Sequence, residues 1–531
     1  MLVEKLARGS LRLVRFVGRR ERLRILIWSA CLIGLTLAVP FAFEYMYSSD
    51  ASSTEGLAVA MQNPAMIAMV GPAPQGVEYT VAVMNVHMMA VFMAIAIAIM
   101  NIFFVVRYTR RDEELGRLEM IGSLPVGHLS MLSATLIVAF LMNLLLGLGV
   151  GLGLAVLGIE GIDLAGSILY GMSLAAVGMV FVGVAAVAAQ LSQTASGAIG
   201  LSMVFMIGSY LLRAVGDMGN EVLSYISPLG LVLRTEAAAN NYWWPVFVMI
   251  AIAAVLIVKA FWLNAIRDMD QGLLPARRGR DRASKFLVRP MGLSLRLMRS
   301  TIVAWAIGLM LLGASYGSIL GDVEAFSDVI AQVTGGSTEA VDFVSVLMMV
   351  LAICATIPCL MMLLRLRGEE KRGRLEGILA EPVSRKKIFR AYLVPALAAS
   401  VVMPVVAVVG LWGAGAAVMD DPIKLGDMLW AVGVFLPAIW MMLGIAAVFI
   451  GIAPKRTVWV WVFLTFSFLT NYLGGMMGLP ELVIQMTPFG HVPATLIESD
   501  VNYVPIIVTA VIAVVLLIVG AKTYQRRDMV E

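Results

Sequence analysis

Charged side chains are scarce in this 531-residue chain: they make up 14% of it, whereas soluble domains carry about 25%. Lys and Arg are absent between Arg24 and Arg107, and again between Arg299 and Arg365. Each gap is apolar and long enough for two helices of about 20 residues with a connection between them. The scarcity of charge therefore excludes a soluble protein and predicts an all-α polytopic membrane protein.

Cysteine and histidine are equally scarce, at three residues each. The cysteines fall inside apolar runs, where a thiol behaves as a small hydrophobe, and this argues against disulfides. No histidine has a second ligand at metal-binding spacing. The sequence therefore lacks both a metal site and the clustered groups that a membrane-embedded lipid enzyme needs. The six residues are Cys31, Cys354, Cys359, His87, His128 and His491.

A phosphate-binding loop is also missing. The dipeptide Gly-Lys never occurs, so no G-x-x-x-x-G-K-[ST] motif exists. No polar stretch is long enough for a nucleotide-binding domain. We therefore expect no catalytic residue and no cofactor bound by this chain, which is not predicted to be an enzyme.

What the chain does contain is a series of about twelve apolar windows, arranged as two sets of six. They are apolar on every face, which argues against barrel strands of alternating character. The expected spans are 25–47, 81–106, 131–157, 168–190, 198–213 and 243–264 in the first set, and 301–320, 342–364, 392–416, 428–451, 457–474 and 503–522 in the second.

The distribution of cations sets the expected orientation. If the N-terminus is cytoplasmic, all of the 39 Lys and Arg residues lie inside except Arg213, Arg234 and Lys424. The net charge of +4 thus serves topology and does not indicate a nucleic-acid partner. The first apolar run is a full span without a cleavage site, so it is not a secretory signal. We predict a multi-pass protein of the cytoplasmic (inner or plasma) membrane with both termini cytoplasmic.

The chain repeats itself in the same orientation. The segment Ser10–Arg15 recurs at Ser294–Arg299, and residues 110–126 match 367–383 at nine of seventeen positions without a gap. Asn-Tyr precedes the last span of each half, and Arg-Asp-Met follows it. Such parallel repeats place a pathway at the interface of the halves. The expected domains are a cytosolic amphipathic helix at 1–24, a six-span half at 25–267, a linker at 268–293 and a second six-span half at 294–531.

The first of these segments carries a basic stripe at a spacing of three and four residues. A helix with such a stripe is expected to lie on the inner membrane surface, with its cations at the lipid headgroups. The alternative interpretation is an ordinary topology anchor. The stripe consists of Lys5, Arg8, Arg12, Arg15 and Arg19.

The repeated loops, 107–130 and 365–390, are the most informative segments. Glu113 and Arg117 are spaced i,i+4, as are Glu370 and Arg374, and this spacing supports a short exposed helix. Each loop helix also has an apolar stripe, formed by Leu115, Leu118 and Ile121 in the first and by Leu375, Ile378 and Leu379 in the second. A proline follows each helix. One amphipathic helix in each half favours docking to a two-fold symmetric cytoplasmic partner over a plain solvated turn.

These loops resemble the first cytoplasmic loop of permeases of ABC exporters for drugs, antibiotics and polysaccharides. The resemblance rests on Glu-x-x-Gly-Arg-Leu-Glu-x-Ile followed by Pro-Val. It implies that each loop is a coupling helix seated on a separate ABC ATPase, present in two copies and carrying ATP and Mg²⁺. The implied coupling residues are Glu113, Gly116, Arg117, Leu118, Glu119 and Pro125, and Glu370, Gly373, Arg374, Leu375, Glu376 and Pro382.

The fused twelve-span form resembles the actinobacterial exporters of polyketide antibiotics, such as tetronasin-type permeases. One departure is that Lys371 and Arg372 replace Glu114 and Leu115. The resemblance also implies a broken, partly re-entrant segment before the last span of each half. Ser227–Gly230 and Thr487–Gly490 fit that expectation. The implied function is ATP-driven export of amphiphilic or hydrophobic, drug-like compounds.

The alternative function is an ion-coupled secondary transporter. Such proteins need charged relays inside the membrane, and no expected span has a central carboxylate. Paired coupling loops would also have no purpose in that interpretation.

Polar and aromatic residues in spans two and eleven are candidates for the substrate pathway, because polar groups inside a bilayer face the protein interior. Helix packing is the alternative interpretation. The glycines at 147, 149, 151 and 153 are spaced for close helix packing. The pathway candidates are Asn85, Asn101, Phe466, Asn471 and Tyr472.

Overall fold

The computed structural model describes residues 9–47, 64–123, 125–158, 161, 163–268, 271–274, 282–321, 340–419, 422–473, 480–493 and 503–527. These residues form helices and contain no strand. Eleven of the helices are long and apolar enough to cross a membrane, and Val458–Tyr472 is a shorter apolar helix where another span was expected. The predicted all-α polytopic membrane fold is confirmed.

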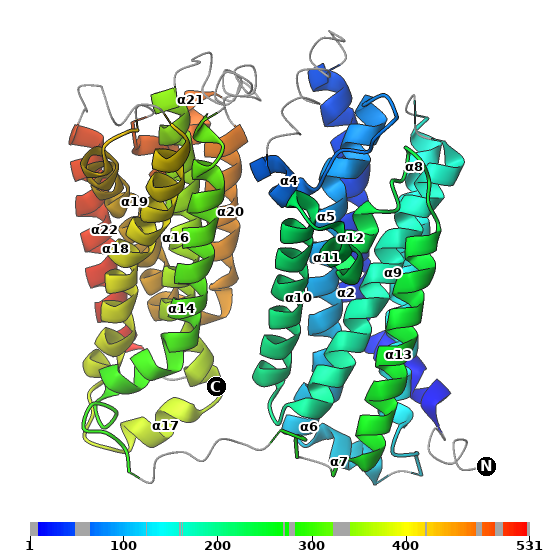
Figure 1. Ribbon diagram of the computed structural model, residues 1–531. Helices are drawn as coiled ribbons and strands as arrows, with labels where there is room; N and C mark the ends of the chain where they lie inside the picture. The colour runs from blue at the N-terminus through cyan, green and yellow to red at the C-terminus, as the bar shows by residue number, and fades with distance from the viewer. Residues whose placement is uncertain are drawn as a thin grey trace. The chain divides into compact units, whose positions relative to one another are not determined.

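The chain forms two compact units, Met1–Arg278 and Gly279–Glu531 (Figure 1). The division falls inside the expected linker. Each unit is described by itself below.

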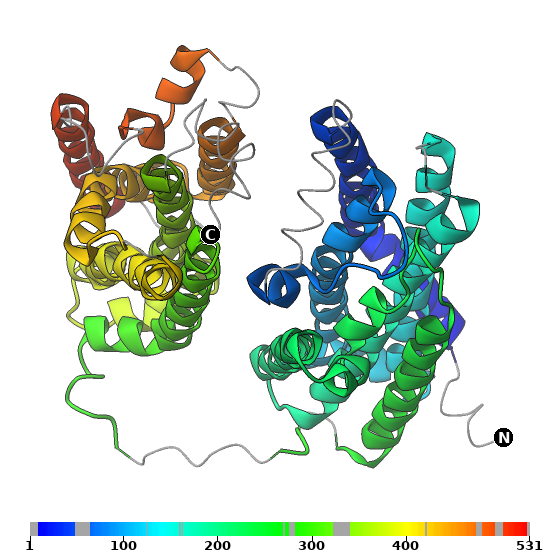
Figure 2. The ribbon, with the colours of Figure 1, turned by 45° about the horizontal axis from the view of Figure 1, so that its top comes forward.

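The first unit is built around α9 (Leu164–Leu191), which packs against α5, α8, α10 and α13, while α2 packs against α5 and α8 (Figure 2). Its other long helices are α2 (Ser10–Tyr47), α5 (Val81–Val106), α8 (Ser130–Leu157), α10 (Ala195–Met218) and α13 (Trp244–Ile266), and α4 (Pro64–Val70), α11 (Glu221–Ile226) and α12 (Pro228–Leu233) are short.

The second unit repeats this packing. Helix α14 lies against α18, as α2 lies against α8, and α19 lies against α22, as α9 lies against α13. The equivalent pairs agree with the parallel repeat seen in the sequence. The long helices are α14 (Pro290–Gly317), α16 (Ala340–Lys371), α18 (Arg385–Val418), α19 (Leu425–Ile452), α20 (Val458–Leu473) and α22 (Tyr503–Arg526).

Several spans begin at side chains that satisfy the unpaired amides of the first turn. Thr80 accepts a hydrogen bond from the Val83 amide, and Asp163 accepts one from the Gly166 amide at 2.7 Å. Thr194 and Ser384 cap α10 and α18 in the same way. The caps of α5, α9 and α10 place the helix starts within four residues of the expected ones, whereas Ser384 starts α18 seven residues before the expected span.

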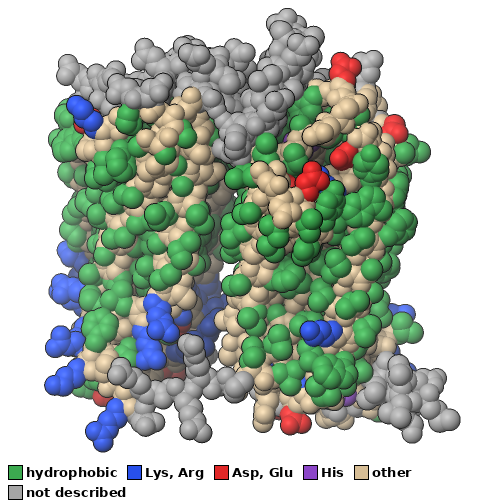
Figure 3. Space-filling view, viewed as in Figure 1, with side chains coloured by type: hydrophobic (Ala, Val, Ile, Leu, Met, Phe, Trp, Pro, Cys, Tyr) green, Lys and Arg blue, Asp and Glu red, His purple; other side chains and the backbone are tan. Residues whose placement is uncertain are grey.

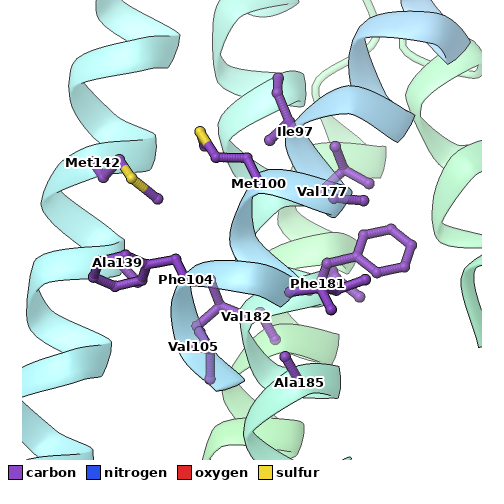
Figure 4. Packing of buried hydrophobic residues seen from close by; sticks show 14 of the residues in the cluster. Ile97, Met100, Phe104, Val105, Ala139, Met142, Val177, Phe181, Val182 and Ala185 are labelled. Carbon is purple, nitrogen blue, oxygen red and sulfur yellow. The ribbon is translucent and has the colours of Figure 1, made fainter. Parts of the chain in front are cut away.

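The core of the first unit lies between α5, α8 and α9 (Figure 4). Met100 and Phe104 of α5 face Met142 and Ala139 of α8, and Phe181 of α9 lies on the other side of α5. All five side chains are buried. This packing fixes the helix that leads into the first repeated loop.

The glycines of α8 pack as the sequence predicts, on two faces of the helix. A Cβ at Gly147 would lie 2.7 Å from the Gly171 carbonyl oxygen of α9, and one at Gly153 would lie 2.8 Å from Leu37 of α2. Gly151 packs against α9, and Gly149 packs against α2, in the same way. Small residues thus let α8 approach both neighbours closely.

We expect Gly171→Ala to destabilise the protein by about 1–3 kcal/mol, because its Cβ would lie 2.1 Å from the Gly147 carbonyl oxygen and force the two backbones apart. The matched control is Gly208→Ala in α10, where no atom lies within 4 Å of the new Cβ; there alanine gains helix propensity. Unfolding titrations in mixed micelles compare the two. Equal stability of both variants would contradict the close packing.

The N-terminal amphipathic segment is not a separate element, because Ser10–Tyr47 is one continuous helix. Its amphipathic character agrees with the prediction: Arg12, Arg15 and Arg19 are exposed, whereas Leu13 and Val17 are buried. Lys5 and Arg8 lie outside the described residues. Helical propensity continues through the expected boundary at residue 24, since neither glycine nor proline occurs between Arg19 and Ile33.

The segments before the last spans are broken, as expected. Ser227 separates α11 from α12, and its hydroxyl accepts from the Gly230 amide; Thr487 accepts from the Gly490 amide in the same way. Both glycines allow close backbone contact: a Cβ at Gly230 would lie 2.2 Å from the Ser224 carbonyl oxygen, and one at Gly490 would lie 2.0 Å from that of Ile484. The Ser/Thr-Pro-x-Gly turn is therefore a second structural repeat.

Lys and Arg gather at one end of each unit, which is called the basic end here. In the first unit it carries α6 (Asp112–Glu114) and α7 (Arg117–Gly122), and in the second it carries α17 (Arg374–Leu379) (Figures 1 and 3). A broad apolar band covers the visible face of each unit beyond that end (Figure 3).

Candidate functional site

The first repeated loop continues the second span and then turns sharply. Helix α5 passes into a π-helical turn, Arg107–Arg111, and into α6 without leaving helical geometry. Gly116 then adopts a left-handed conformation, with φ of 66°, and α7 begins at Arg117. A left-handed residue ends a helix, and glycine adopts this conformation without steric cost. The α7 segment is thus joined rigidly to the second span.

The second unit has the same construction. Helix α16 runs without a break to Lys371, Gly373 is left-handed with φ of 67°, and α17 begins at Arg374. The two loops therefore share one backbone design, although their sequences differ at eight of the seventeen aligned positions.

A buried glutamate fastens each loop to the last span of its unit. Glu113 lies 2.9 Å from Arg267, just beyond α13, and 2.9 Å from Arg110. In the second unit Glu370 pairs with Arg527, at the end of α22, and lies 3.6 Å from Arg367. Each carboxylate is 6% exposed. Such buried charges need their partners, since removing one leaves an uncompensated charge.

The arginine that precedes each glutamate also fastens the loop between the fourth and fifth spans. Arg110, which is 1% exposed, donates to the Gln193 carbonyl oxygen at 2.8 Å. Arg367 donates to the Pro454 carbonyl oxygen at 3.2 Å. Three segments that lie far apart in the sequence therefore meet at this point in each unit.

A second acidic residue links the start of each loop helix to the first span. Asp112 accepts from Arg117 at 2.7 Å and from Arg20 of α2 at 3.0 Å. In the second unit Glu369 pairs with Arg374 and with Arg365. Arg365 in turn donates to the Leu297 carbonyl oxygen of α14 at 2.8 Å. Each loop helix is thus connected through charged groups to the first and last spans of its own unit.

The predicted i,i+4 pairs are not the ones that form. Arg117 pairs with Asp112, and Arg374 pairs with Glu369, five residues away in both cases. The reason is the left-handed glycine, which interrupts the helix between each expected pair. Glu113 and Glu370 are turned inward to Arg267 and Arg527 instead.

The apolar stripes of the loop helices face their own units. Leu118 and Ile121 pack against the core of the first unit, and Leu375, Ile378 and Leu379 pack against that of the second; Leu115, at the turn, is 55% exposed. The outward surface of the helices carries charged residues of both signs and, in α7, Met120, which is 74% exposed. Exposed members of the predicted coupling set are Arg117, Glu119, Pro125, Gly373, Arg374, Glu376 and Pro382.

The two loops differ at Glu114, which is replaced by Lys371 in the second unit, and this difference changes a contact of the loop. Glu114 accepts a hydrogen bond from the Ala195 amide at 2.8 Å and so caps the start of α10. Its counterpart, Lys371, is exposed and cannot accept a hydrogen bond. The first loop is therefore tied to its fifth span by a contact that the second lacks.

The predicted pathway residues fall in both units, Asn85 and Asn101 in the first and Phe466, Asn471 and Tyr472 in the second. Asn101 is fully buried and exchanges two hydrogen bonds with Asn143 of α8, at 2.8 and 2.9 Å. Asn471 donates to Thr487 at 2.7 Å and so holds the broken segment. Asn85 is buried, Tyr472 is half-buried and stacks on Phe468, and Phe466 is 37% exposed. The contacts of Asn101 and Asn471 are those of helix packing.

The end of the first unit opposite its basic end carries buried charge. The side chains of Arg213 and Asp217 are fully buried and lie 3.2 Å apart, and Arg234 lies 3.6 Å from the same carboxylate. Arg213 also donates to the carbonyl oxygens of Ala68 and Met69 in α4. These contacts hold Arg213 and Arg234, which are two of the three cations that the expected orientation does not place on the cytoplasmic side. A cavity of about 440 Å³ adjoins them.

Two comparisons with known proteins fit this architecture. The family model described as "Multidrug efflux system permease Rv1217c, C-terminal domain" matches residues 15–263 and 287–525, which hold the long helices of the two units in turn. The multidrug efflux system permease protein Rv1217c of Mycobacterium tuberculosis is 33% identical over 533 residues, which cover 98% of this chain and 95% of that protein.

The chain belongs to this family of multidrug efflux permeases. It is a multi-pass membrane protein. The resemblance to drug exporters is thereby confirmed, and the narrower likeness to tetronasin-type permeases stays a prediction.

Several charged residues of the permease's loop anchors were absent from the predicted coupling set, among them Asp112, Glu369, Arg267 and Arg527. A signal for them was present in the sequence. Asp112 and Glu369 align in the repeated loop, and the two arginines open the repeated Arg-Asp-Met. Glu113 and Arg267 likewise recur in the second half of the permease as Glu370 and Arg527. An acid and a base that recur together indicate a pair, even though 154 residues separate Glu113 from Arg267.

Proposed function

We propose that this chain is the membrane-spanning permease of an ATP-driven exporter, coupled through α7 and α17 to two copies of a separate ABC ATPase. The single observation that carries the proposal is the repeated loop design: a left-handed glycine, an exposed short helix and a buried acid–arginine lock, present once in each unit. Two equivalent docking elements suit a partner with two equivalent copies.

In this proposal the basic end of each unit is cytoplasmic, because Lys and Arg concentrate on that side of the membrane. Both termini are then cytoplasmic, and the membrane is the inner or plasma membrane. The partner ATPase binds ATP and Mg²⁺, and this chain contributes no catalytic group. Its ligands are membrane lipid and small amphiphilic compounds, as drug efflux by the relative suggests.

The coupling step follows from the contacts of each loop. Closure of the ATPase dimer pushes on the exposed face of α7, where Glu119 lies. The push passes through Arg117 and Asp112 to Arg20 of α2, and the Glu113–Arg267 pair carries it to the end of α13. Because the loop continues α5 without a break, the spans move as rigid elements. In the second unit Glu369 and Glu370 do the same.

The test is drug uptake by inverted membrane vesicles that contain the permease together with the ABC ATPase that co-purifies with it. We expect uptake to require hydrolysable ATP and to persist when ionophores collapse the proton and sodium gradients. Uptake that follows an ion gradient and ignores ATP would contradict the proposal and favour an ion-coupled transporter.

A further inference from the structure

At its basic end the first unit has a pocket that the coupling proposal does not use. It encloses about 280 Å³ between α2, α5 and α10. Three arginines and one glutamate line one part of it, and aromatic and methionine side chains line the rest. The charged residues are Glu21, Arg24, Arg107 and Arg111, and the apolar ones include Trp28 and Phe103.

The arginines are arranged so that positive charge remains available. Glu21 is buried, with 3% exposure, and holds Arg24 and Arg107, the latter at 3.4 Å. It also accepts from Tyr108 at 2.7 Å. Arg111 is exposed, and no carboxylate pairs with it among the described residues. The pocket therefore has three guanidinium groups and one carboxylate, and each guanidinium group has five N–H donors. The excess favours an anionic group that can accept several hydrogen bonds.

The apolar wall continues from the charged part toward the middle of the spans. Trp28 of α2 is 41% exposed and Phe103 of α5 is 48% exposed, so the pocket is open on the side where both lie. Trp28 lies one helical turn beyond Arg24, and Phe103 lies one turn before Arg107. An anionic headgroup beside the arginines would thus leave its hydrocarbon chains against exposed aromatic surface.

The second unit does not repeat this lining, although it repeats the loop anchors. In the ungapped alignments of the repeats, Glu21 and Arg24 correspond to Trp305 and Gly308, and Arg107 and Arg111 correspond to Leu364 and Gly368. All four charged positions are uncharged there. The second unit thus retains the coupling residues but lacks all four charges of the pocket. This difference indicates that the pocket has a role in the first unit only.

We propose that this pocket binds the headgroup of an anionic phospholipid from the inner leaflet, with the phosphate held by Arg24, Arg107 and Arg111. Basic pockets between spans on the cytoplasmic side suit such headgroups. The volume holds a headgroup and not a whole lipid, so the acyl chains lie outside along Trp28 and Phe103. The choice of leaflet rests on the orientation given under the proposed function.

The test is native mass spectrometry of the purified permease after incubation with phosphatidylglycerol, phosphatidylcholine or inorganic phosphate. The pocket variant is Arg24→Gln, Arg111→Gln. The matched control, Arg22→Gln, Lys259→Gln, removes two exposed cations of the same unit, one in α2 and one in α13, that neither line the pocket nor belong to the basic stripe. We expect the pocket variant to retain phosphatidylglycerol about tenfold less than wild type, and the control to retain it as wild type does.

Equal phosphatidylglycerol retention by the two variants, or equal retention of phosphatidylcholine and phosphatidylglycerol by the wild type, would overturn the proposal. Displacement of phosphatidylglycerol by inorganic phosphate would show a free-anion site and would also overturn it. Because this readout needs neither ATP nor transport, its failure is distinguishable from failure of the proposed function. A size-exclusion profile equal to that of wild type shows that the pocket variant is folded.

Discussion

Replacing Glu113 by alanine is expected to destabilise the permease by about 3–5 kcal/mol, which is the usual cost of removing one partner of a buried ion pair. The substitution leaves Arg110, with 1% of its side chain exposed, and Arg267, with 8% exposed, without their carboxylate. It also frees the end of α13 from the loop. Unfolding titrations in mixed detergent micelles measure the change.

A double-mutant cycle separates this pair from general damage. Arg267→Ala in the Glu113→Ala background should cost less than Arg267→Ala alone, because the arginine has then already lost its partner. Glu119→Ala is the matched control, since this exposed side chain of the same loop should change the stability by no more than about 0.5 kcal/mol. Equal costs for Glu113→Ala and Glu119→Ala would show that the lock does not hold the loop. Glu370 and Arg527 allow the same cycle in the second unit.

The double variant Glu119→Arg, Glu376→Arg should abolish drug efflux while the protein stays folded. Both side chains are exposed on the short helices and have no ion-pair partner among the described residues, so the fold does not depend on them. Like charges placed across an interface cost several kcal/mol, and we expect association with the ATPase to fall by about 100-fold or more. Drug accumulation in cells that express each variant measures the loss.

The charge-retaining variant Glu119→Asp, Glu376→Asp is the control for this pair, and it should keep most of the efflux. Size exclusion in detergent should give the same profile for all three proteins. Normal efflux by the arginine variant would mean that these faces do not carry the coupling contact.

The spans and the internal repeat could be predicted because each depends on local pattern. Apolar runs set the spans, and the repeated loop is visible without any structure. The partners of Arg117 and Arg374 could not be predicted from spacing, because the left-handed glycine changes which residues face each other. A glycine permits that conformation and does not require it. The bond between Glu113 and Arg267 was missed for another reason: pairing across 154 residues depends on tertiary packing.

The apolar stripes of the loop helices could also be predicted only in part. Its period predicted a helix with one apolar face, and the structure has such a helix at α7 and at α17. The period does not say what covers that face. The structure shows that Leu118, Leu375 and Ile378 pack against their own units, whereas Glu119 and Glu376 are exposed. Likewise, the amphipathic pattern of residues 10–24 was correct, but it could not show that the helix continues into the first span.

The most direct test of the central claim is the composition of the complex purified from native membranes in mild detergent. With this chain as the tagged component, quantitative mass spectrometry counts the partner subunits. The account predicts a separate ATP-binding-cassette ATPase at about two copies per permease chain, lost in the Glu119→Arg, Glu376→Arg variant. A permease that purifies without any ATPase, and that still transports drugs in reconstituted vesicles under a proton or sodium gradient, would contradict it.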